Sequence, residues 1–101
     1  IAFDVRSQLP EGFIPYDCPL SFEVLFVFPL LSSMKKSVRQ AIEDGVIVYK
    51  PTKPDLQDNL MKILADSMNG IVFVDDSRIC KVSSQKIYGL IPRTEVIIKP
   101  L

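Results

Sequence analysis

The chain has 101 residues, with 12 Lys+Arg against 12 Asp+Glu, two cysteines and no histidine. A chain of this length builds one hydrophobic core, so we expect a single domain over residues 1–101. The absence of histidine excludes Ser-His-Asp and Cys-His nucleophilic sites and imidazole zinc sites, which leaves carboxylates, lysines, hydroxyls or a metal to carry any chemistry. A net charge of zero, taken alone, argues against nucleic-acid binding.

No membrane span or export signal is predicted. The longest apolar stretch, Leu20–Leu31, is too short to cross a bilayer. Cys18 and Cys80 match no metal or disulfide pattern, which predicts reduced thiols in a cytoplasmic protein. Because the chain begins at Ile1 and not at methionine, we expect further residues to precede it.

The first half of the chain contains a predicted helix end and a predicted strand. Residues 2–8 are typical of the tail of a helix that Pro10 and Gly12 end. Residues 20–28 alternate aromatic and β-branched side chains, a pattern that predicts a well-buried strand closed by Pro29.

Helices and strands alternate after that point. A helix is predicted from a cap at Ser32 or Ser33 to about Asp44, where Gly45 ends it. The further predicted elements are a short extended piece at 46–49, a helix at 55–69, an apolar run at 71–74, a strand at 78–86, a turn at 89–92 and a strand at 94–99. They predict a small α/β (α+β) domain with a mixed β-sheet and two or three helices.

Acidic residues gather on and after the second predicted helix. On one face, spaced by three and four residues, it carries Asp55, Asp58, Lys62 and Asp66. Asp75 and Asp76 stand at the mouth of the next strand, where alternation lets at most one of them face the helix. Three carboxylates converging from two elements suit a hard cation such as Mg²⁺, which can activate water and polarise a phosphate.

A purely structural interpretation fits the same residues. Asp55 and Asp58 suit the N-cap and N3 positions of a helix, and Asp58 with Lys62 is an ordinary i,i+4 ion pair. Asp75-Asp76-Ser77 is also typical of a turn. Spacing alone does not decide between the two interpretations.

A family resemblance lies in the segment Lys53–Ile79, which reads K-P-D-L-Q-D-N-L-M-K-I-L-A-D-S-M-N-G-I-V-F-V-D-D-S-R-I. It resembles the signature of the RusA family of Holliday-junction endonucleases. In that family a P-D-x-D-N-x-x-K helix start precedes a D-x-(L/M)-N-G helix end and an apolar-D-D-S-x-(I/V) strand entry. The later K-I-Y-G and E-V-I-I also resemble the family, so the similarity covers about residues 20–99.

This resemblance implies a homodimer, bacterial or phage-encoded, that uses Mg²⁺ or Mn²⁺ to nick four-way DNA junctions. It implies Asp55, Asp58 and Asp76 as catalytic metal ligands, with Asp75 as the other member of its pair. Lys62 matches the catalytic lysine, and Asp66 matches a family acidic position that we assign to structure.

The chain departs from the family pattern at two places. Gln57 turns the usual D-x-D into D-x-x-D, so either the two aspartates share a helical face or Gln57 bulges and leaves Asp55 in the loop. The family's additional N-terminal strand is also not visible in this chain.

Basic residues are clustered although the net charge is zero. We expect a DNA phosphate backbone to contact Lys35, Lys36, Arg39, Lys50, Lys53 and Lys86, with binding that weakens as salt rises. The alternative for the residues of the first helix is a solvated helix face.

The sequence therefore predicts a metal-dependent, structure-selective endonuclease that resolves Holliday junctions by hydrolysing phosphodiester bonds in paired strands. The alternative is a non-catalytic dimeric DNA- or protein-binding module on the same fold. That alternative holds if the insertion of Gln57 or the absence of N-terminal residues has inactivated the catalytic site.

Overall fold

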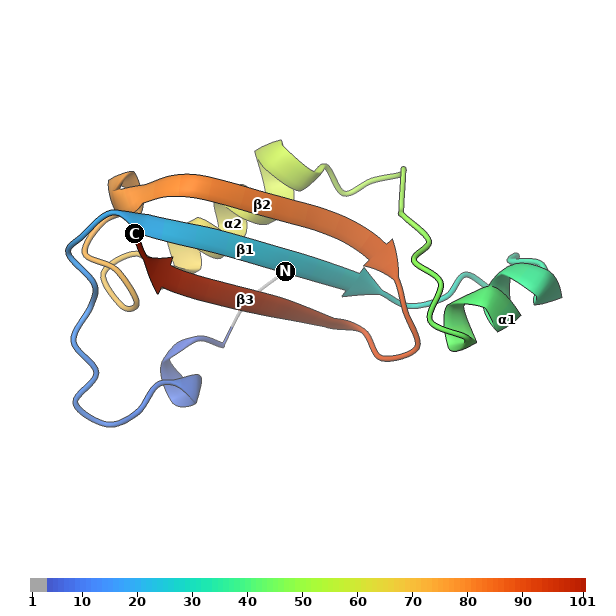
Figure 1. Cartoon of the computed structure of the whole chain (residues 1–101), viewed down its shortest axis with the longest axis horizontal. Helices are drawn as coiled ribbons and strands as arrows, with labels where there is room; N and C mark the ends of the chain where they lie inside the picture. The colour runs from blue at the N-terminus through green and yellow to red at the C-terminus, as the bar shows by residue number, and fades with distance from the viewer. Residues whose placement is uncertain (1–3) are drawn as a thin grey trace.

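A three-stranded sheet in the order β2-β1-β3 forms the centre of the computed structural model, which describes residues 4–101 (Figure 1). β1 (Leu20–Phe28) pairs in parallel with β2 (Ile79–Tyr88) and antiparallel with β3 (Arg93–Pro100). The crossover that a parallel pair requires contains α1 (Lys36–Glu43), the π-helical η2 (Leu56–Met61) and α2 (Lys62–Met68). This mixed sheet with its helices confirms the predicted fold class.

β1 has the bounds that the sequence predicts, and it is the central strand. The side chains of Phe22, Val24 and Phe26 are buried on the face toward α2, where they pack with Leu64 and Phe73. The rings of Phe22 and Phe73 meet edge to face with their centroids 6.3 Å apart. Burying a side chain of this size contributes about 1.5–3 kcal/mol, so this layer is what holds the helical segment on the sheet.

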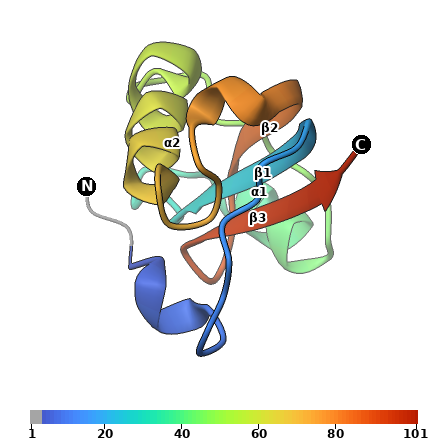
Figure 2. The same cartoon turned by 90° about the vertical axis from the view of Figure 1, so that its left-hand side faces the viewer.

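One face of the sheet is covered. Figure 2 shows α2 and the N-terminal segment, which contains the 3₁₀ turn η1 (Arg6–Gln8), on the same side of the strands. Of the predicted helix tail at 2–8, residues 2 and 3 lie outside the described residues, and the described part forms only this short turn. The molecule measures 47 × 26 × 24 Å, because α1 lies beyond the end of the sheet (Figure 1).

The predicted serine cap of α1 is wrong. The helix begins at Lys36, its N-cap is Lys35, and no side chain caps it. The guanidinium of Arg39 instead donates to the carbonyls of Leu31 and Met34, which ties down the turn before the helix. The predicted end is confirmed: Gly45 has φ 91°, and the N–H groups of residues 45 and 46 return to the carbonyls of residues 42 and 41.

The second predicted helix is two segments, because its first turns are π-helical. The Leu60 N–H donates to the carbonyl of Asp55 at 3.0 Å, a bond across five residues where an α-helix spans four. A π turn accommodates one extra residue, and Gln57 lies inside it. The regular α2 then runs to Met68, and Gly70 follows with φ 74°.

The remaining elements differ from prediction in small ways. Residues 71 and 72 form a turn, and Phe73 then makes isolated bridges with Tyr16 and Asn69. The extended piece at 46–49 reduces to one bridge between Tyr49 and Ile87. The last two strands extend further than predicted, by two residues at the end of β2 and by one at each end of β3. Among residues 4–101, no helix has the length and apolarity that crossing a membrane requires.

Candidate active site

Asp55 and Asp58 stand at the start of the helical segment. Asp55 has an extended backbone (φ −65°, ψ 135°) and precedes η2, whereas Asp58 lies in its first turn. Both side chains are exposed, and that of Asp55 accepts no capping hydrogen bond. Of the two arrangements that Gln57 allows, the structure therefore adopts the bulge, with Asp55 outside the helix and its carboxylate free of a capping role.

Lys62 is the first residue of α2 and is exposed. The ion pairs within residues 4–101 are Arg78 with Asp17, at 2.8 Å, and Arg93 with Glu95, at 2.7 Å. The i,i+4 pair that a structural role would give to Asp58 and Lys62 is thus not formed. Both charged groups remain open to solvent.

Asp75 and Asp76 lie in the 3₁₀ turn η3 (Asp76–Arg78) and its cap, so the strand alternation expected of this pair does not apply. The Asp75 carboxylate accepts a hydrogen bond from the Ser77 N–H at 3.1 Å. This hydrogen bonding by Ser77 lowers the pKa of Asp75 below its ordinary value. Asp75 therefore has the structural role of a turn cap, whereas the exposed side chain of Asp76 takes no part in that cap.

The four aspartates form two separate acidic groups, Asp55 with Asp58 and Asp75 with Asp76. The seven residues of α2 alone correspond to about 10 Å at 1.5 Å per residue, and the chain turns back directly after Met68. Figure 1 shows η3 at the start of β2, on the side of the α2 end that is further from η2. Within residues 4–101 no three acidic or cysteine side chains come close enough to hold one ion. The oxygen donors suit a hard cation, but the described part of one chain does not bring three of them together around one ion.

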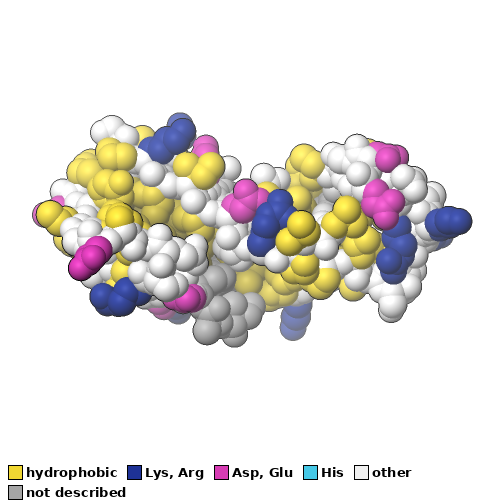
Figure 3. Space-filling view, turned by 90° about the horizontal axis from the view of Figure 1, so that it is seen from below, with side chains coloured by type: hydrophobic (Ala, Val, Ile, Leu, Met, Phe, Trp, Pro, Cys, Tyr) yellow, Lys and Arg dark blue, Asp and Glu magenta, His cyan; other side chains and the backbone are white. Residues whose placement is uncertain are grey.

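The six predicted DNA contacts divide into two sets. Lys35, Lys36 and Lys53 are exposed. Arg39 holds loop carbonyls, and the amines of Lys50 and Lys86 both bond to residues of the Lys50–Pro54 segment. On the face drawn in Figure 3, basic and acidic side chains are interspersed with hydrophobic ones.

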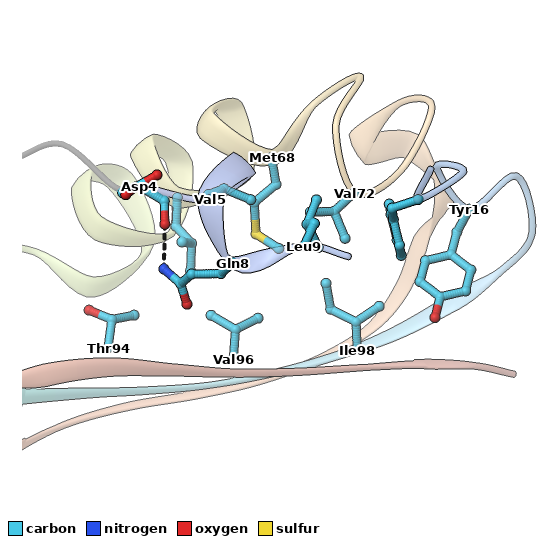
Figure 4. A pocket seen from close by; sticks show the side chains of 12 residues that line it. Asp4, Val5, Gln8, Leu9, Tyr16, Met68, Val72, Thr94, Val96 and Ile98 are labelled. Atoms are coloured by element: carbon cyan, nitrogen blue, oxygen red, sulfur yellow. Dashed lines mark hydrogen bonds between the residues drawn. The ribbon is translucent and has the colours of Figure 1, made fainter. Parts of the chain in front are cut away.

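An apolar cavity of about 350 Å³ lies away from both acidic groups, between the N-terminal segment, α2 and β3. In Figure 4 Val5 and Leu9 face Val96 and Ile98 across it, and Met68 closes one side. Asp4 is the one charged residue in its lining, and neither a basic side chain nor any of the candidate site aspartates contributes to it, so the cavity is not part of the candidate active site.

Comparison with known proteins gives two matches. The family model described as Endodeoxyribonuclease RusA matches residues 4–99. The chain is also 30% identical over 99 residues to the uncharacterized protein YqaN of Bacillus subtilis (strain 168), covering 98% of this chain and 68% of YqaN. No solved structure gave a match. Both acidic groups lie inside the residues that the family model matches.

Proposed function

This chain belongs to the RusA family of endodeoxyribonucleases, and we propose that it is a metal-dependent, structure-selective nuclease that cuts Holliday junctions. One observation carries the proposal: at the position of the family's acidic motif, Asp55 and Asp58 present exposed carboxylates outside any helix cap or ion pair within residues 4–101. Carboxylates held this way have no structural partner to lose when they bind a ligand.

The proposed roles follow the chemistry of phosphodiester hydrolysis. In this proposal Asp55 and Asp58 bind a divalent cation, Mg²⁺ or Mn²⁺, and Asp76 would join them once the two acidic groups, which lie apart in this structure, are brought together, while Asp75 is assigned to the turn. A bound cation supplies charge neutralisation at the scissile phosphate and a more acidic water. The Lys62 ammonium lies one turn after Asp58 and has no ion pair within residues 4–101, and it stabilises the negative charge that grows on the phosphate oxygens.

DNA binding and dimerisation complete the proposal. Lys35, Lys36 and Lys53 are assigned to the phosphate backbone, because their amines are exposed. Symmetric cutting of two opposed strands requires two active sites, and a homodimer with a two-fold axis provides them.

The decisive experiment uses synthetic four-way junctions with Mg²⁺ and three variants. We expect Asp58→Asn and Asp76→Asn each to lower the cleavage rate by about a hundredfold or more, which is typical when a group that stabilises the transition state is removed. Asp66→Asn is the matched control, since Asp66 is an exposed aspartate of α2, and its rate should stay near that of the parent. Retained cleavage in both site variants would contradict the assignment.

A second candidate function is a non-catalytic junction-binding module. It is favoured by the separation of the aspartates into two groups within one chain. Tight, salt-sensitive junction binding by the parent, with no cleavage in either Mg²⁺ or Mn²⁺ and no Mg²⁺-dependent rise in melting temperature, would support this module over the nuclease.

A further inference from the structure

The segment that leads to Asp55 is attached to the free edge of β2 only as far as Lys50. The Lys50 N–H donates to the Lys86 carbonyl, and the Tyr88 N–H to the Val48 carbonyl, each at 3.0 Å. Beyond this point, residues 51–54 make no backbone–backbone hydrogen bonds within the described chain, and Pro51 and Pro54 have no N–H to donate. Something other than the sheet must therefore hold the Pro51–Pro54 segment in place.

Lys86 provides that attachment. Its amine donates to the carbonyl of Thr52 at 2.6 Å and to the carbonyl of Pro54 at 2.7 Å. The Pro54 carbonyl belongs to the peptide directly before Asp55. Hydrogen bonds from a charged donor are about twice as strong as neutral ones, and this lysine is half-buried on the covered face of the sheet, opposite Phe26.

Lys50 adds a second attachment on the same segment. Its amine donates to the Thr52 hydroxyl at 2.9 Å and lies 5.2 Å from the centroids of the Phe28 and Tyr88 rings. The two aromatic rings belong to the ends of β1 and β2, so the lysine links the segment to the rigid sheet.

We propose that Lys86 is a positioning residue that fixes the Pro51–Pro54 segment, and through it Asp55 and the π turn, with Lys50 as its auxiliary. The chain of contacts is continuous: the Lys86 amine holds the Pro54 carbonyl, Asp55 follows, and the Asp55 carbonyl accepts the Leu60 N–H. The lysine then serves the protein backbone and not a DNA phosphate. Its effect on cleavage rests on the proposed function, whereas its effect on the segment does not.

Lys86→Met tests this inference, because methionine keeps much of the apolar stem and removes the donor. Lys81→Met is the matched control, since Lys81 is an exposed lysine of the same strand whose side chain makes no hydrogen bond or ion pair in the described chain. The first readout is hydrogen exchange of the Leu60 amide. We expect the exchange rate of this amide to rise about tenfold or more in Lys86→Met, because a hydrogen bond from a charged donor is lost, and to stay unchanged in Lys81→Met.

The second readout separates positioning from DNA contact. We expect Lys86→Met to lower kcat about tenfold or more and to raise the Mg²⁺ concentration for half-maximal cleavage, while junction affinity and its salt dependence stay as in the parent. Lys86→Arg, which keeps a charged donor, should recover part of the loss. A merely structural role would not shift the Mg²⁺ dependence at saturating junction.

Two outcomes with Lys86→Met would overturn the inference, and a third outcome isolates it from the proposed function. An unchanged exchange rate of the Leu60 amide in Lys86→Met overturns it. Weaker junction binding also overturns it if the slope of log affinity against log salt concentration falls by about one, because that change indicates a lost phosphate contact. If Lys86→Met does not fold, Lys50→Met replaces it, with faster Leu60 exchange supporting the inference and unchanged exchange contradicting it. If the parent cuts no junction, the proposed function fails while the exchange result still decides whether Lys86 holds the segment.

Discussion

Gly89→Ala should destabilise the protein through one identifiable contact. Gly89 lies in the turn from β2 to β3, where its N–H donates to the Phe28 carbonyl at 2.9 Å. A Cβ at this position would lie closer to Cγ1 of the buried Val27 side chain than real Cβ atoms come to their neighbours. Non-bonded carbons prefer about 3.5–4.0 Å, so the added methyl would overlap its neighbour and one of the two must move.

The magnitude follows from two opposing effects. Forcing an extra methyl into a packed site costs about 1–3 kcal/mol, and the stiffer unfolded chain returns about 0.4–1 kcal/mol. The mid-points of these ranges leave a net loss of about 1.3 kcal/mol, which lowers the melting temperature of a domain this size by about 5–10 °C. Thermal unfolding followed by circular dichroism, with urea unfolding as the free-energy measure, gives both values.

Val27→Ala tests the cause in a double-mutant cycle. This substitution removes the methyl that the new Cβ would meet, so Gly89→Ala should cost less in its presence than in the parent. We expect a coupling free energy of about 1 kcal/mol in the favourable direction. Additive costs, or an unchanged melting temperature for Gly89→Ala, would show that the turn does not cross over Val27 as the structure has it.

Three further predictions concern the helical segment and the turn after it. Deleting Gln57 restores the D-x-D spacing and should convert the π turn to an α turn. We therefore expect retained cleavage and an undiminished melting temperature, with the helix content measured by circular dichroism. Loss of folding would contradict the interpretation of Gln57 as a bulge. Leu64→Ala, at a side chain 2% exposed, should cost about 2–5 kcal/mol in urea unfolding, and a cost below about 1 kcal/mol would contradict the packing of α2 on the sheet. Hydrogen bonding by Ser77 lowers the pKa of Asp75 in the folded state below its value in the unfolded state. The ionised carboxylate therefore stabilises the fold at any pH above the unfolded-state pKa, and this contribution is lost as the pH falls through the folded-state pKa. The melting temperature of Asp75→Asn should therefore lie below that of the parent at pH 7, and the difference should narrow as the pH is lowered below the ordinary value of 3.8; a difference independent of pH would refute it.

Local patterns in the sequence account for much of the fold. The alternation over residues 20–28 predicts the central strand with its bounds, because period-two burial is a property of the strand itself. Gly45 predicts the end of α1 for an equally local reason, since the left-handed conformation there favours glycine. The sequence has no histidine but has an acidic motif, and these two features by themselves favour carboxylate-based catalysis over histidine-based catalysis.

Tertiary structure alone decides which charged groups are available. Lys50 and Lys86 are residues of the kind that form a DNA-binding patch, but their amines bond to the Lys50–Pro54 segment. Lys86 is 32 residues away in the sequence from Pro54, whose carbonyl it holds. The same holds for the aspartates: the sequence pattern predicts that three of them converge, whereas within residues 4–101 no three acidic side chains come close enough to hold one ion. Side-chain periodicity determines the face on which a residue lies, whereas its partners depend on strand pairing and on the path of the connecting segments, which no local pattern records.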